Sequence, residues 1–325
     1  MKYDFITIGG ATEDITFYTR EGILIDNKKD ILRQKLLAFE YGAKIKVDKA
    51  HLSFGGGAAN TAVSLSRLGF KTASLICVGD DNRGKRILAN LKKQKVNVKL
   101  AQKLKRRESG FSFLLVGPNN EHIVFSNRAA NSQLRITNYE LRILRKTKWI
   151  YLTSLSGKWQ DVLEKVFSVN KVKIVWNPGH IQLKAGTKKI GKYIKKSAVL
   201  CLNKDEAIEL VVSKYKKNTT KYLNNVKNLL KDLKCMGPGM VVITNGKYGA
   251  DVYDGENFYH QNILKEKRRV DTTGVGDAFG SSFVAGLELY NGNIKKATGL
   301  SMRNTASVIG QQGAQNGLIQ LAITN

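Results

Sequence analysis

Hydrophobic residues along the chain alternate between short apolar runs and longer amphipathic segments. The apolar runs have the length of strands that are buried on both faces, and they cover residues 5–8, 73–78, 149–152, 173–176, 198–202 and 240–244. Helical periodicity is present in most of the intervening segments, at residues 58–68, 84–94, 160–169, 221–233, 277–290 and 295–309. This alternation predicts an α/β fold in three layers, α/β/α, with a mostly parallel central sheet covered by helices on both faces.

Two segments interrupt this alternation. Residues 111–116 and 122–126 flank Gly117-Pro-Asn-Asn120, which predicts a β-hairpin with a four-residue loop. A two-stranded ribbon is not stable alone, so we expect it to pair with other strands or with a partner subunit. The second interruption covers residues 14–52, within which Asn27 to Tyr41 has a helical pattern. We therefore expect a single domain over residues 1–325 with two inserted segments, at about 14–52 and 108–127.

The stretch Asp271-Thr-Thr-Gly-Val-Gly-Asp-Ala-Phe-Gly280 places glycines and a carboxylate at the predicted start of a helix. Gly274 and Gly276 have no Cβ, so the backbone can approach an anion closely, and the first amides of a helix have no intrahelical partner. Asp277 can accept the proton of an attacking hydroxyl while these amides stabilise the charge on a phosphoryl group. The alternative is a glycine turn followed by an acid that complements the helix dipole.

These residues resemble the second signature of the PfkB, or ribokinase-like, family of sugar and nucleoside kinases. Gly55-Gly-Gly-Ala-Ala-Asn60, followed by Arg67-Leu-Gly69, is similar to the first signature of the family. Further blocks follow in the family's order, at 78–81 with Gly84, at 203–206 and at 244–250. The resemblance covers roughly residues 3–317 and implies the ribokinase-like form of the sandwich, in which the two inserted segments form a small β lid over the substrate. Such lids often clasp one another, so it also implies a homodimer.

The resemblance implies that these motifs transfer a phosphoryl group from ATP. Asp277 would be the general base for a substrate hydroxyl, expected to be primary, and the backbone amides of Gly274, Val275 and Gly276 would bind the transferring phosphate. The substrate would be bound by Asp14, whose carboxylate can accept hydrogen bonds from two neighbouring hydroxyls, together with Gly55, Gly56, Asn60 and Asn131. The nucleotide would lie near Thr244, Gly246, Gly249 and Asn304.

Asn203 and Glu206 have two interpretations. Their spacing is that of an Asn N-cap with an acid three residues on, which stabilises the start of a helix without any catalysis. The resemblance implies instead that they organise Mg²⁺ and phosphate through water, which suits a hard cation that keeps its waters. Both interpretations can hold at once.

Asp271 and Gly313 resemble the loops that bind a monovalent cation, usually K⁺, in some members of the family. The following residues, Asn316 and Gly317, differ from the pattern of the potassium-dependent ribose kinases. The resemblance therefore makes K⁺ a candidate ligand, and leaves dependence on it open.

The net charge of +28 does not identify a partner. Lysines are spread over nearly every segment and greatly outnumber the arginines, whereas phosphate and base recognition tends to use Arg. Solvated helix faces explain this distribution better than nucleic-acid binding does, so we expect no specific nucleic-acid partner.

No apolar run reaches the ~18 residues of a membrane helix, and no signal peptide is recognisable. The cysteines and histidines have no disulfide or zinc spacing, and we expect a cytoplasmic protein.

Two other nucleotide-binding classes can be tested on the sequence itself. No Gly-Lys pair is followed by Ser or Thr, which excludes a P-loop kinase, and the glycine spacing does not fit a Rossmann dehydrogenase. We expect an ATP- and Mg²⁺-dependent kinase of a small sugar. The alternatives are a nucleoside kinase of the same family and a non-catalytic sensor of sugars or nucleosides, against which the retained site residues argue.

The sequence leaves the substrate open. Gly57 stands where ribose-specific members of the family commonly carry Lys, which weakens an assignment to ribose. Trp176-Asn-Pro-Gly179 also departs from the family's usual Asp-Pro-Asn-Pro. A hexose or keto-sugar acid kinase, a ribose kinase and a nucleoside kinase all fit the motifs.

Overall fold

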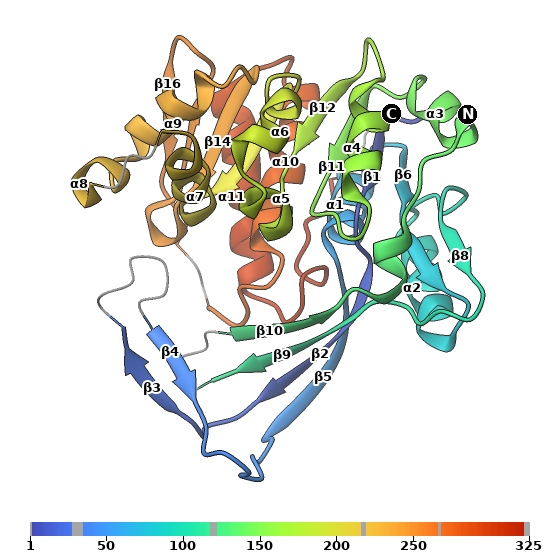
Figure 1. Cartoon of the computed structure of the whole chain (residues 1–325), viewed down its shortest axis with the longest axis vertical. Helices are drawn as coiled ribbons and strands as arrows, with labels where there is room; N and C mark the ends of the chain where they lie inside the picture. Colours follow the sequence, from blue (N-terminus) through green and yellow to red (C-terminus); the bar gives the residue numbers. More distant parts are fainter. Residues whose placement is uncertain (1, 28–34, 118–121, 216–218, 266–267, 322–325) are drawn as a thin grey trace.

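A computed structural model describes residues 2–27, 35–117, 122–215, 219–265 and 268–321. Its central sheet is built from strands β1 (Phe5–Ile8), β6 (Thr72–Leu75), β11 (Trp149–Leu152), β12 (Lys173–Trp176), β13 (Val199–Asn203), β14 (Met240–Thr244), β15 (Ala250–Tyr253) and β16 (Phe258–Gln261). Their order is β16-β15-β14-β13-β12-β11-β1-β6 (Figure 1). All neighbouring pairs from β6 to β14 are parallel, and β15 and β16 extend one edge antiparallel.

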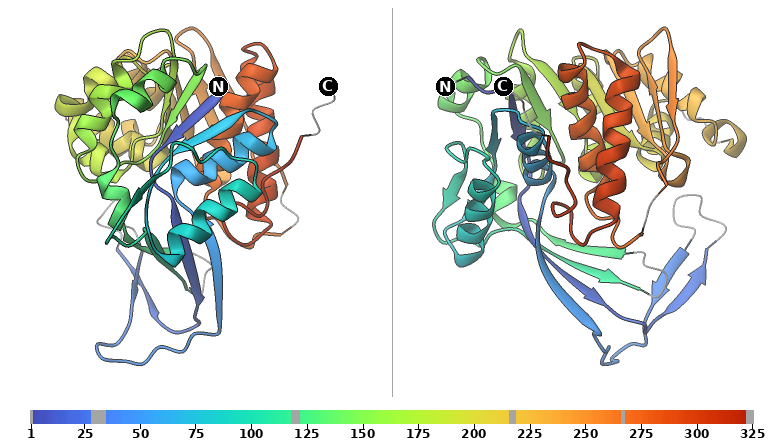
Figure 2. Two further views of the ribbon diagram at one scale, coloured as in Figure 1. Left: turned by 90° about the vertical axis from the view of Figure 1, so that its right-hand side faces the viewer. Right: turned by 180° about the vertical axis from the view of Figure 1, so that it is seen from behind.

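Helices cover both faces of this sheet, as Figures 1 and 2 show from opposite sides. One layer contains α3 (Asn138–Leu144), α4 (Trp159–Phe167), α5 (His180–Lys184), α6 (Gly186–Ile194), α7 (Lys204–Tyr215), α8 (Thr220–Leu223) and α9 (Val226–Lys234). The other contains α1 (Gly57–Arg67), α10 (Val275–Leu289) and α11 (Ile294–Ile309), with α2 (Asn82–Lys93) packed beside α1.

The central strands are apolar on both faces because each face contacts a helical layer. Along β11, Ile150 and Leu152 pack with the layer of α4 to α9, whereas Trp149 and Tyr151 pack with α10 and α11. Successive side chains of a strand point to opposite faces, so a continuous apolar run fills two cores at once. This explains why the runs at 5–8, 149–152, 173–176 and 240–244 predict these strands correctly.

A smaller sheet lies beyond the carboxyl ends of the central strands and forms a lid (Figure 1). It contains β2 (Thr12–Tyr18), β5 (Lys49–Gly55), β9 (Phe111–Val116) and β10 (His122–Asn127), in the order β10-β9-β2-β5. The predicted hairpin is thus present as β9 and β10, and β9 continues the sheet by pairing with β2. The tip of its predicted loop, 118–121, lies outside the described residues.

The predicted helix from Asn27 to Tyr41 is wrong in its described part. Residues Lys35–Ala38 form strand β4, which pairs antiparallel with β3 (Ile23–Asp26), and residues 28–34 lie outside the described chain. The physical reason is that this ribbon extends into solvent, with all of β3 exposed. The spacing of apolar residues indicates the type of secondary structure only where one face of the element is buried.

Two further elements are divided where the sequence predicts one. The run 73–78 contains β6 and then β7 (Cys77–Gly79), which leaves the central sheet to pair with β8 (Gln102–Leu104). The predicted helix 221–233 is α8 followed by α9, because the Asn225 side chain accepts a hydrogen bond from Lys227 N and begins a new helix. Short 3₁₀ turns occur at η1 (Ala129–Gln133) and η2 (Gly246–Tyr248).

Candidate functional site

Helix α10 begins at the glycine-rich turn, with its N-terminus at the carboxyl edge of the central sheet. Gly274 is the N-cap residue in the left-handed region (φ 74°), and a Cβ there would lie 2.4 Å from the Ala314 Cβ, so the turn requires glycine. The first helical bond runs from Ala278 N to Gly274 O, so the amides of the first turn have no helical acceptor. The Val275 amide has only a long contact, 3.5 Å, to Thr272 O. A Cβ at Gly276 would meet open space, so this end of the helix can be approached.

Asp277 lies in this first turn and is held by α1. Its Oδ2 accepts a hydrogen bond from Asn60 Nδ2 at 2.9 Å. Burial raises the pKa of the Asp277 carboxyl to about 6, the Asn60 hydrogen bond opposes this, and the Asp14 carboxylate adds to it. A carboxyl group with this pKa is ionised at neutral pH and can still accept a proton readily.

A cavity of about 200 Å³ opens beside Asp277. Its walls come from the carboxyl ends of β13 and β14 and from the first turns of α7 and α10, and the lining residues are Asn177, Cys201, Leu202, Asn203, Glu206, Val242, Thr244, Gly274, Gly276, Asp277, Phe279 and Gly280. The structure therefore brings together the predicted base, the glycines of the anion site, and residues predicted to organise metal and nucleotide. Asn177 was not predicted as a site residue; it lies in the segment Trp176–Gly179 that departs from the family pattern.

Asn203 and Glu206 form a reciprocal cap at the start of α7. Asn203 Oδ1 accepts from Glu206 N at 2.9 Å, and Glu206 Oε2 accepts from Asn203 N at 2.8 Å. The capping interpretation is therefore correct as local structure. Burial raises the pKa of the Glu206 carboxyl to about 7, and the bond from Asn203 N opposes the rise. Glu206 also lines the cavity with Asp277, so the cap places a second carboxylate at this cavity.

Asp14, on β2, is 5% exposed at the junction of the lid and the sandwich. Its Oδ1 has no hydrogen-bond partner among the described residues, so it can accept from a bound hydroxyl. Burial raises the pKa of the Asp14 carboxyl, and the hydroxyls of Thr12 and Ser112 offset part of the increase. Gly56, with φ 88°, packs against the Gly10 carbonyl, where a Cβ would come within 2.6 Å.

Asn131 supports the strand that carries Asp14. Its Oδ1 accepts from Ala11 N at 3.1 Å and its Nδ2 donates to Ala11 O at 3.0 Å, and the side chain is buried. It thereby fixes the backbone three residues before Asp14. The contacts that the structure gives to the Asn131 amide are to protein backbone.

Asn304, which is predicted to border the nucleotide, lies in the core of the structure. Its side chain is fully buried between α1, α10 and α11, where Nδ2 donates to the hydroxyls of Ser64 and Ser282 and Oδ1 accepts from Ile319 N. A buried amide needs such partners, and these contacts are all internal. Asn304 is a core residue in this structure and does not line the cavity.

The turn after β14 lies at the rim of the same cavity. Thr244 lines the cavity, and Gly246 (φ 53°) and Gly249 (φ 87°) bound the 3₁₀ turn η2 that leads into β15. A Cβ at Gly249 would come within 2.0 Å of Gln261 O on β16. Gly249 is therefore required by the packing of this turn, whatever it binds.

The loop over residues 310–318, which follows α11, joins the parts of the site to one another. Gly313 N donates to Asp271 Oδ2 at 2.8 Å, while Asp271 Oδ1 accepts from Thr273 N at 2.8 Å. The predicted cation residues Asp271 and Gly313 are thus directly bonded, and they hold the loop against the glycine turn.

In the same loop, Gln312 Nε2 donates to the Tyr18 hydroxyl of the lid at 2.7 Å, and Gln315 Nε2 donates to Asn60 Oδ1 at 3.0 Å. The sequence gives no local signal for these side-chain contacts.

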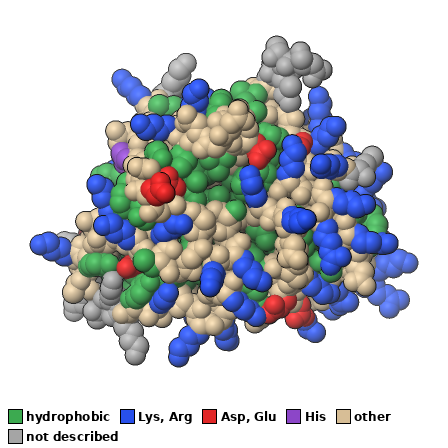
Figure 3. Space-filling model, turned by 90° about the horizontal axis from the view of Figure 1, so that it is seen from above, with side chains coloured by type: hydrophobic (Ala, Val, Ile, Leu, Met, Phe, Trp, Pro, Cys, Tyr) green, Lys and Arg blue, Asp and Glu red, His purple; other side chains and the backbone are tan. Residues whose placement is uncertain are grey.

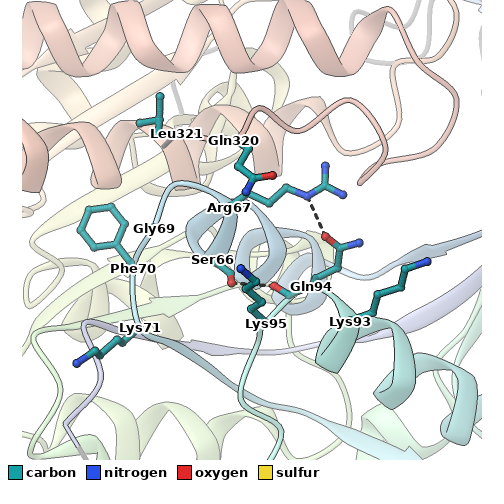
Figure 4. Close-up of a pocket in the computed structure, with 10 residues that line it drawn as sticks. All are labelled: Ser66, Arg67, Gly69, Phe70, Lys71, Lys93, Gln94, Lys95, Gln320 and Leu321. Carbon is teal, nitrogen blue, oxygen red and sulfur yellow. Dashed lines mark hydrogen bonds between the residues drawn. The ribbon is translucent and has the colours of Figure 1, made fainter. Parts of the chain in front are cut away.

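Two further hollows lie at the opposite edge of the central sheet, away from the lid. One, of about 540 Å³, is lined by Ser66, Arg67, Gly69, Phe70, Lys71, Lys93, Gln94, Lys95, Gln320 and Leu321 (Figure 4). The other is lined by Lys2, Arg145, Lys146, Thr147, Lys148 and Lys171. Cations in the first hollow lie at the C-terminal ends of α1 and α2, where they offset the helix dipoles. Lysines and arginines are spread over this whole face (Figure 3).

The α/β/α body, the β lid and the cavity at a glycine-rich helix start define a ribokinase-like sugar kinase, a phosphotransferase. The chain belongs to the PfkB family of carbohydrate kinases, because the model of the pfkB family carbohydrate kinase matches residues 27–321. It is 26% identical over 320 residues to the ATP-dependent 6-phosphofructokinase of Thermoanaerobacterium thermosaccharolyticum, which covers 92% of this chain and 94% of that protein.

Solved structures confirm the fold. The nucleoside kinase of Methanocaldococcus jannaschii superposes with a TM-score of 0.76 at 20% identity, over 97% of this chain and 95% of that one. The Arabidopsis thaliana ribokinase, solved with ribose and ATP, gives a TM-score of 0.78 at 17% identity, over 98% and 96%. No helix in the described residues is long and apolar enough to cross a membrane.

Proposed function

We propose that this protein transfers the γ-phosphoryl group of ATP to a hydroxyl, expected to be primary, of a small sugar. The observation that carries the proposal is the meeting of Asp277, the N-terminal turn of α10 and Glu206 around one cavity. A general base, a set of backbone donors and a second carboxylate are the groups that phosphoryl transfer requires from a protein, because most of the catalysis is positioning and charge stabilisation.

In this proposal Asp277 takes the proton of the attacking hydroxyl. The amides at Gly274, Val275 and Gly276 bind the transferring phosphoryl group, and their fixed orientation stabilises charge without reorganisation. The unpartnered Oδ1 of Asp14 and the Asn60 amide orient the sugar, with Gly55 and Gly56 permitting close approach. The nucleotide lies along Asn203, Thr244 and the Gly246–Gly249 turn.

The residues fit a magnesium ion that keeps most of its waters. The described residues contain no group of three His, Cys, Asp or Glu side chains that could hold a metal directly. Mg²⁺ commonly binds through one or two carboxylates together with substrate phosphates, and Glu206 offers one such carboxylate in the cavity. When bound, the ion neutralises phosphate charge; Asn203 and Glu206 orient its waters. Asp271 and Gly313 remain the candidates for a monovalent cation.

The lid has the composition of a surface that is covered during function. Ile23, on the β3–β4 ribbon that we count with the lid, is 71% exposed, and Phe125 and Leu52 are exposed on the lid strands. A patch of this kind marks an interface or a surface that closes on a ligand. We propose that the lid closes over the substrate and excludes water, and that two lids clasp one another in a homodimer.

A coupled assay of ADP release tests the function. Purified protein with ATP and Mg²⁺ would be screened against ribose, hexoses, keto-sugar acids, nucleosides and fructose 6-phosphate, the last because of its 6-phosphofructokinase relative. Turnover with one sugar, lowered on the order of 10²- to 10⁴-fold in Asp277→Asn, is the expected result. Turnover only with nucleosides would favour the nucleoside kinase. Saturable sugar binding by calorimetry without any turnover would overturn the proposal in favour of the sensor.

A further inference from the structure

An uninterrupted series of side-chain hydrogen bonds ends on Asp277. Asn60 Nδ2 donates to Asp277 Oδ2 at 2.9 Å, Gln315 Nε2 donates to Asn60 Oδ1 at 3.0 Å, and Asn90 Nδ2 donates to Gln315 Oε1 at 2.9 Å. Asn60 and Gln315 are both buried. The three amides come from α1, the loop after α11, and α2, so the series spans segments that are far apart in the sequence.

The direction of the series follows from its end at a carboxylate. An ionised carboxylate can only accept, so Asn60 must present its amino group to Asp277. Its carbonyl oxygen then faces Gln315, which must donate, and the Gln315 carbonyl in turn accepts from Asn90. Without a donor at position 315, the carbonyl oxygen of Asn60 would lose its partner, and Asp277 alone would hold the orientation of the Asn60 amide.

We propose that Gln315 is a positioning residue for phosphoryl transfer: it fixes the Asn60 amide, which keeps Oδ2 of Asp277 occupied and leaves Oδ1 to receive the substrate proton. The inference rests on the proposed role of Asp277 as general base. In the resulting step the substrate O–H bond breaks and its proton passes to Asp277 Oδ1. The hydroxyl oxygen forms the new bond to the γ-phosphorus, and ADP leaves with the electron pair of the broken P–O bond.

The electrostatic surroundings make this hydrogen bond important. The titratable groups that the described residues place around Asp277 include Asp14 of β2, Glu206 of α7, Tyr151 of β11 and Cys201 of β13. Tyr151 and Cys201 are neutral, whereas the Asp14 carboxylate opposes ionisation of Asp277, as does burial. The bond from Asn60 favours the ionised form and lowers the pKa of Asp277. Losing the correct orientation of Asn60 therefore raises that pKa above about 6.

The test is the pH profile of Gln315→Met, which retains the length of the side chain and removes the donor. We expect the acid limb of kcat/KM to move to higher pH by roughly one unit, giving a loss of about fivefold at pH 6 and little loss at pH 8.5. Gln311→Met, at an exposed position of the same loop, is the matched control and should keep the wild-type profile. An unchanged profile, or an equal loss at every pH, would overturn the role of Gln315.

A second variant tests the proposal if Gln315→Met does not fold, and a direct titration measures the effect on Asp277 itself. If Gln315→Met does not fold, Asn90→Leu removes the outer end of the series and should shift the profile in the same direction by less; no shift would count against the proposal. Carboxyl NMR, with Asp277→Asn used for assignment, should show the Asp277 titration at higher pH in Gln315→Met. An unchanged titration overturns the role of Gln315 alone, whereas full turnover by Asp277→Asn overturns Asp277 as the base.

Discussion

The carboxylate of Asp14 lies against the backbone of Gly55, so closely that a Cβ at position 55 would come within 1.8 Å of Asp14 Oδ2. The two residues belong to paired strands of the lid sheet, in which Gly55 is opposite Thr12 and Asp14 is opposite Ser53. The glycine therefore sets the position of the carboxylate. Any larger residue must displace Asp14 or separate the strands.

Gly55→Ala should weaken sugar binding more than it slows chemistry. Because the new methyl group displaces the Asp14 carboxylate, we expect KM for the sugar to rise about tenfold or more, the scale of one misplaced polar contact, while KM for ATP changes little. Gly191→Ala is the control, since a Cβ there meets nothing within 4 Å. Equal increases in both KM values would show that the variant disturbs the whole cleft instead.

Asp277→Asn should lose on the order of 10²- to 10⁴-fold in kcat, the usual contribution of a positioned general base. The amide keeps the shape of the side chain, so the fold and ATP binding should persist. Circular dichroism and calorimetric titration with ATP check these two points. Turnover near the wild-type value, with chemistry shown to be rate-limiting, would contradict the assignment.

The pH dependence of the wild-type enzyme should show an acid limb near pH 6. Burial raises the pKa of Asp277 to about 6, so below that pH the carboxyl is protonated and cannot accept the substrate proton, and kcat/KM should fall about tenfold per pH unit. Glu206, with a pKa of about 7, titrates in the same range, and the two groups are coupled. We attribute the acid limb to Asp277, so the limb should remain in Glu206→Gln. If the limb disappears in that variant, it belongs to Glu206.

Glu206→Gln should raise the Mg²⁺ concentration needed for half-maximal rate while leaving the KM for sugar nearly unchanged. The same variant reports on stability. The folded protein binds this proton more tightly than the unfolded chain does, because the pKa rises from 4.5 to about 7, so stability conferred by the protonated form is lost as the pH rises through this interval. We therefore expect Glu206→Gln to have a higher Tm than the wild type at pH 8 and a similar Tm near pH 4.5.

The control for this variant is Glu256→Gln, at an exposed position in the turn between β15 and β16. A lower Tm at pH 8 together with an unchanged Mg²⁺ requirement would mean that Glu206 serves only as the cap of α7. The Tm and the Mg²⁺ requirement are measured on the same preparation, so the role of Glu206 as a helix cap can be distinguished from its proposed role in Mg²⁺ binding.

The proposed dimer can be tested at Ile23. Light scattering should give a mass near twice 36.1 kDa for the wild type, and Ile23→Asp should give a monomer because it places a charge in the apolar lid surface. Leu289→Asp is the matched control, since Leu289 is 41% exposed at the C-terminal end of α10, the end away from the lid. Lid amides should also become protected from hydrogen exchange when the correct sugar is added; a wild-type monomer with fully protected lid amides would contradict both parts.

The sequence predicts the six parallel strands of the central sheet well because their burial leaves a strong pattern, whereas β15 and β16, which are less buried, are not among its predictions. Strands such as Trp149–Leu152 and Met240–Thr244 are apolar throughout and coincide with their predicted runs. The ribbon β3–β4 leaves no such pattern, since Leu24 and Leu36 are exposed rather than buried. Local apolar spacing then favours a helix that the structure does not contain.

The residues of the candidate site also divide into those that the sequence predicts and those that it does not. Motif residues such as Asp277 and Glu206 are predictable because Asp277 follows a glycine-rich turn at the start of a helix, and Glu206 stands at the start of a helix that follows a buried strand. The roles of buried amides are not, because Asn304 and Asn60 have the same side chain, yet one bonds only to the core and the other to Asp277. Gln315 lies 255 residues from Asn60, so only the folded chain shows that they meet.

The loop over residues 310–318 has a consequence for synthesis on the ribosome. Its bonds to Tyr18, Asp271 and Asn60 reach strands and helices that leave the ribosome much earlier. Until this loop emerges, the growing polypeptide carries the lid and the glycine turn without the contacts that order them relative to each other. These contacts can therefore form only after nearly all of the core residues have been translated.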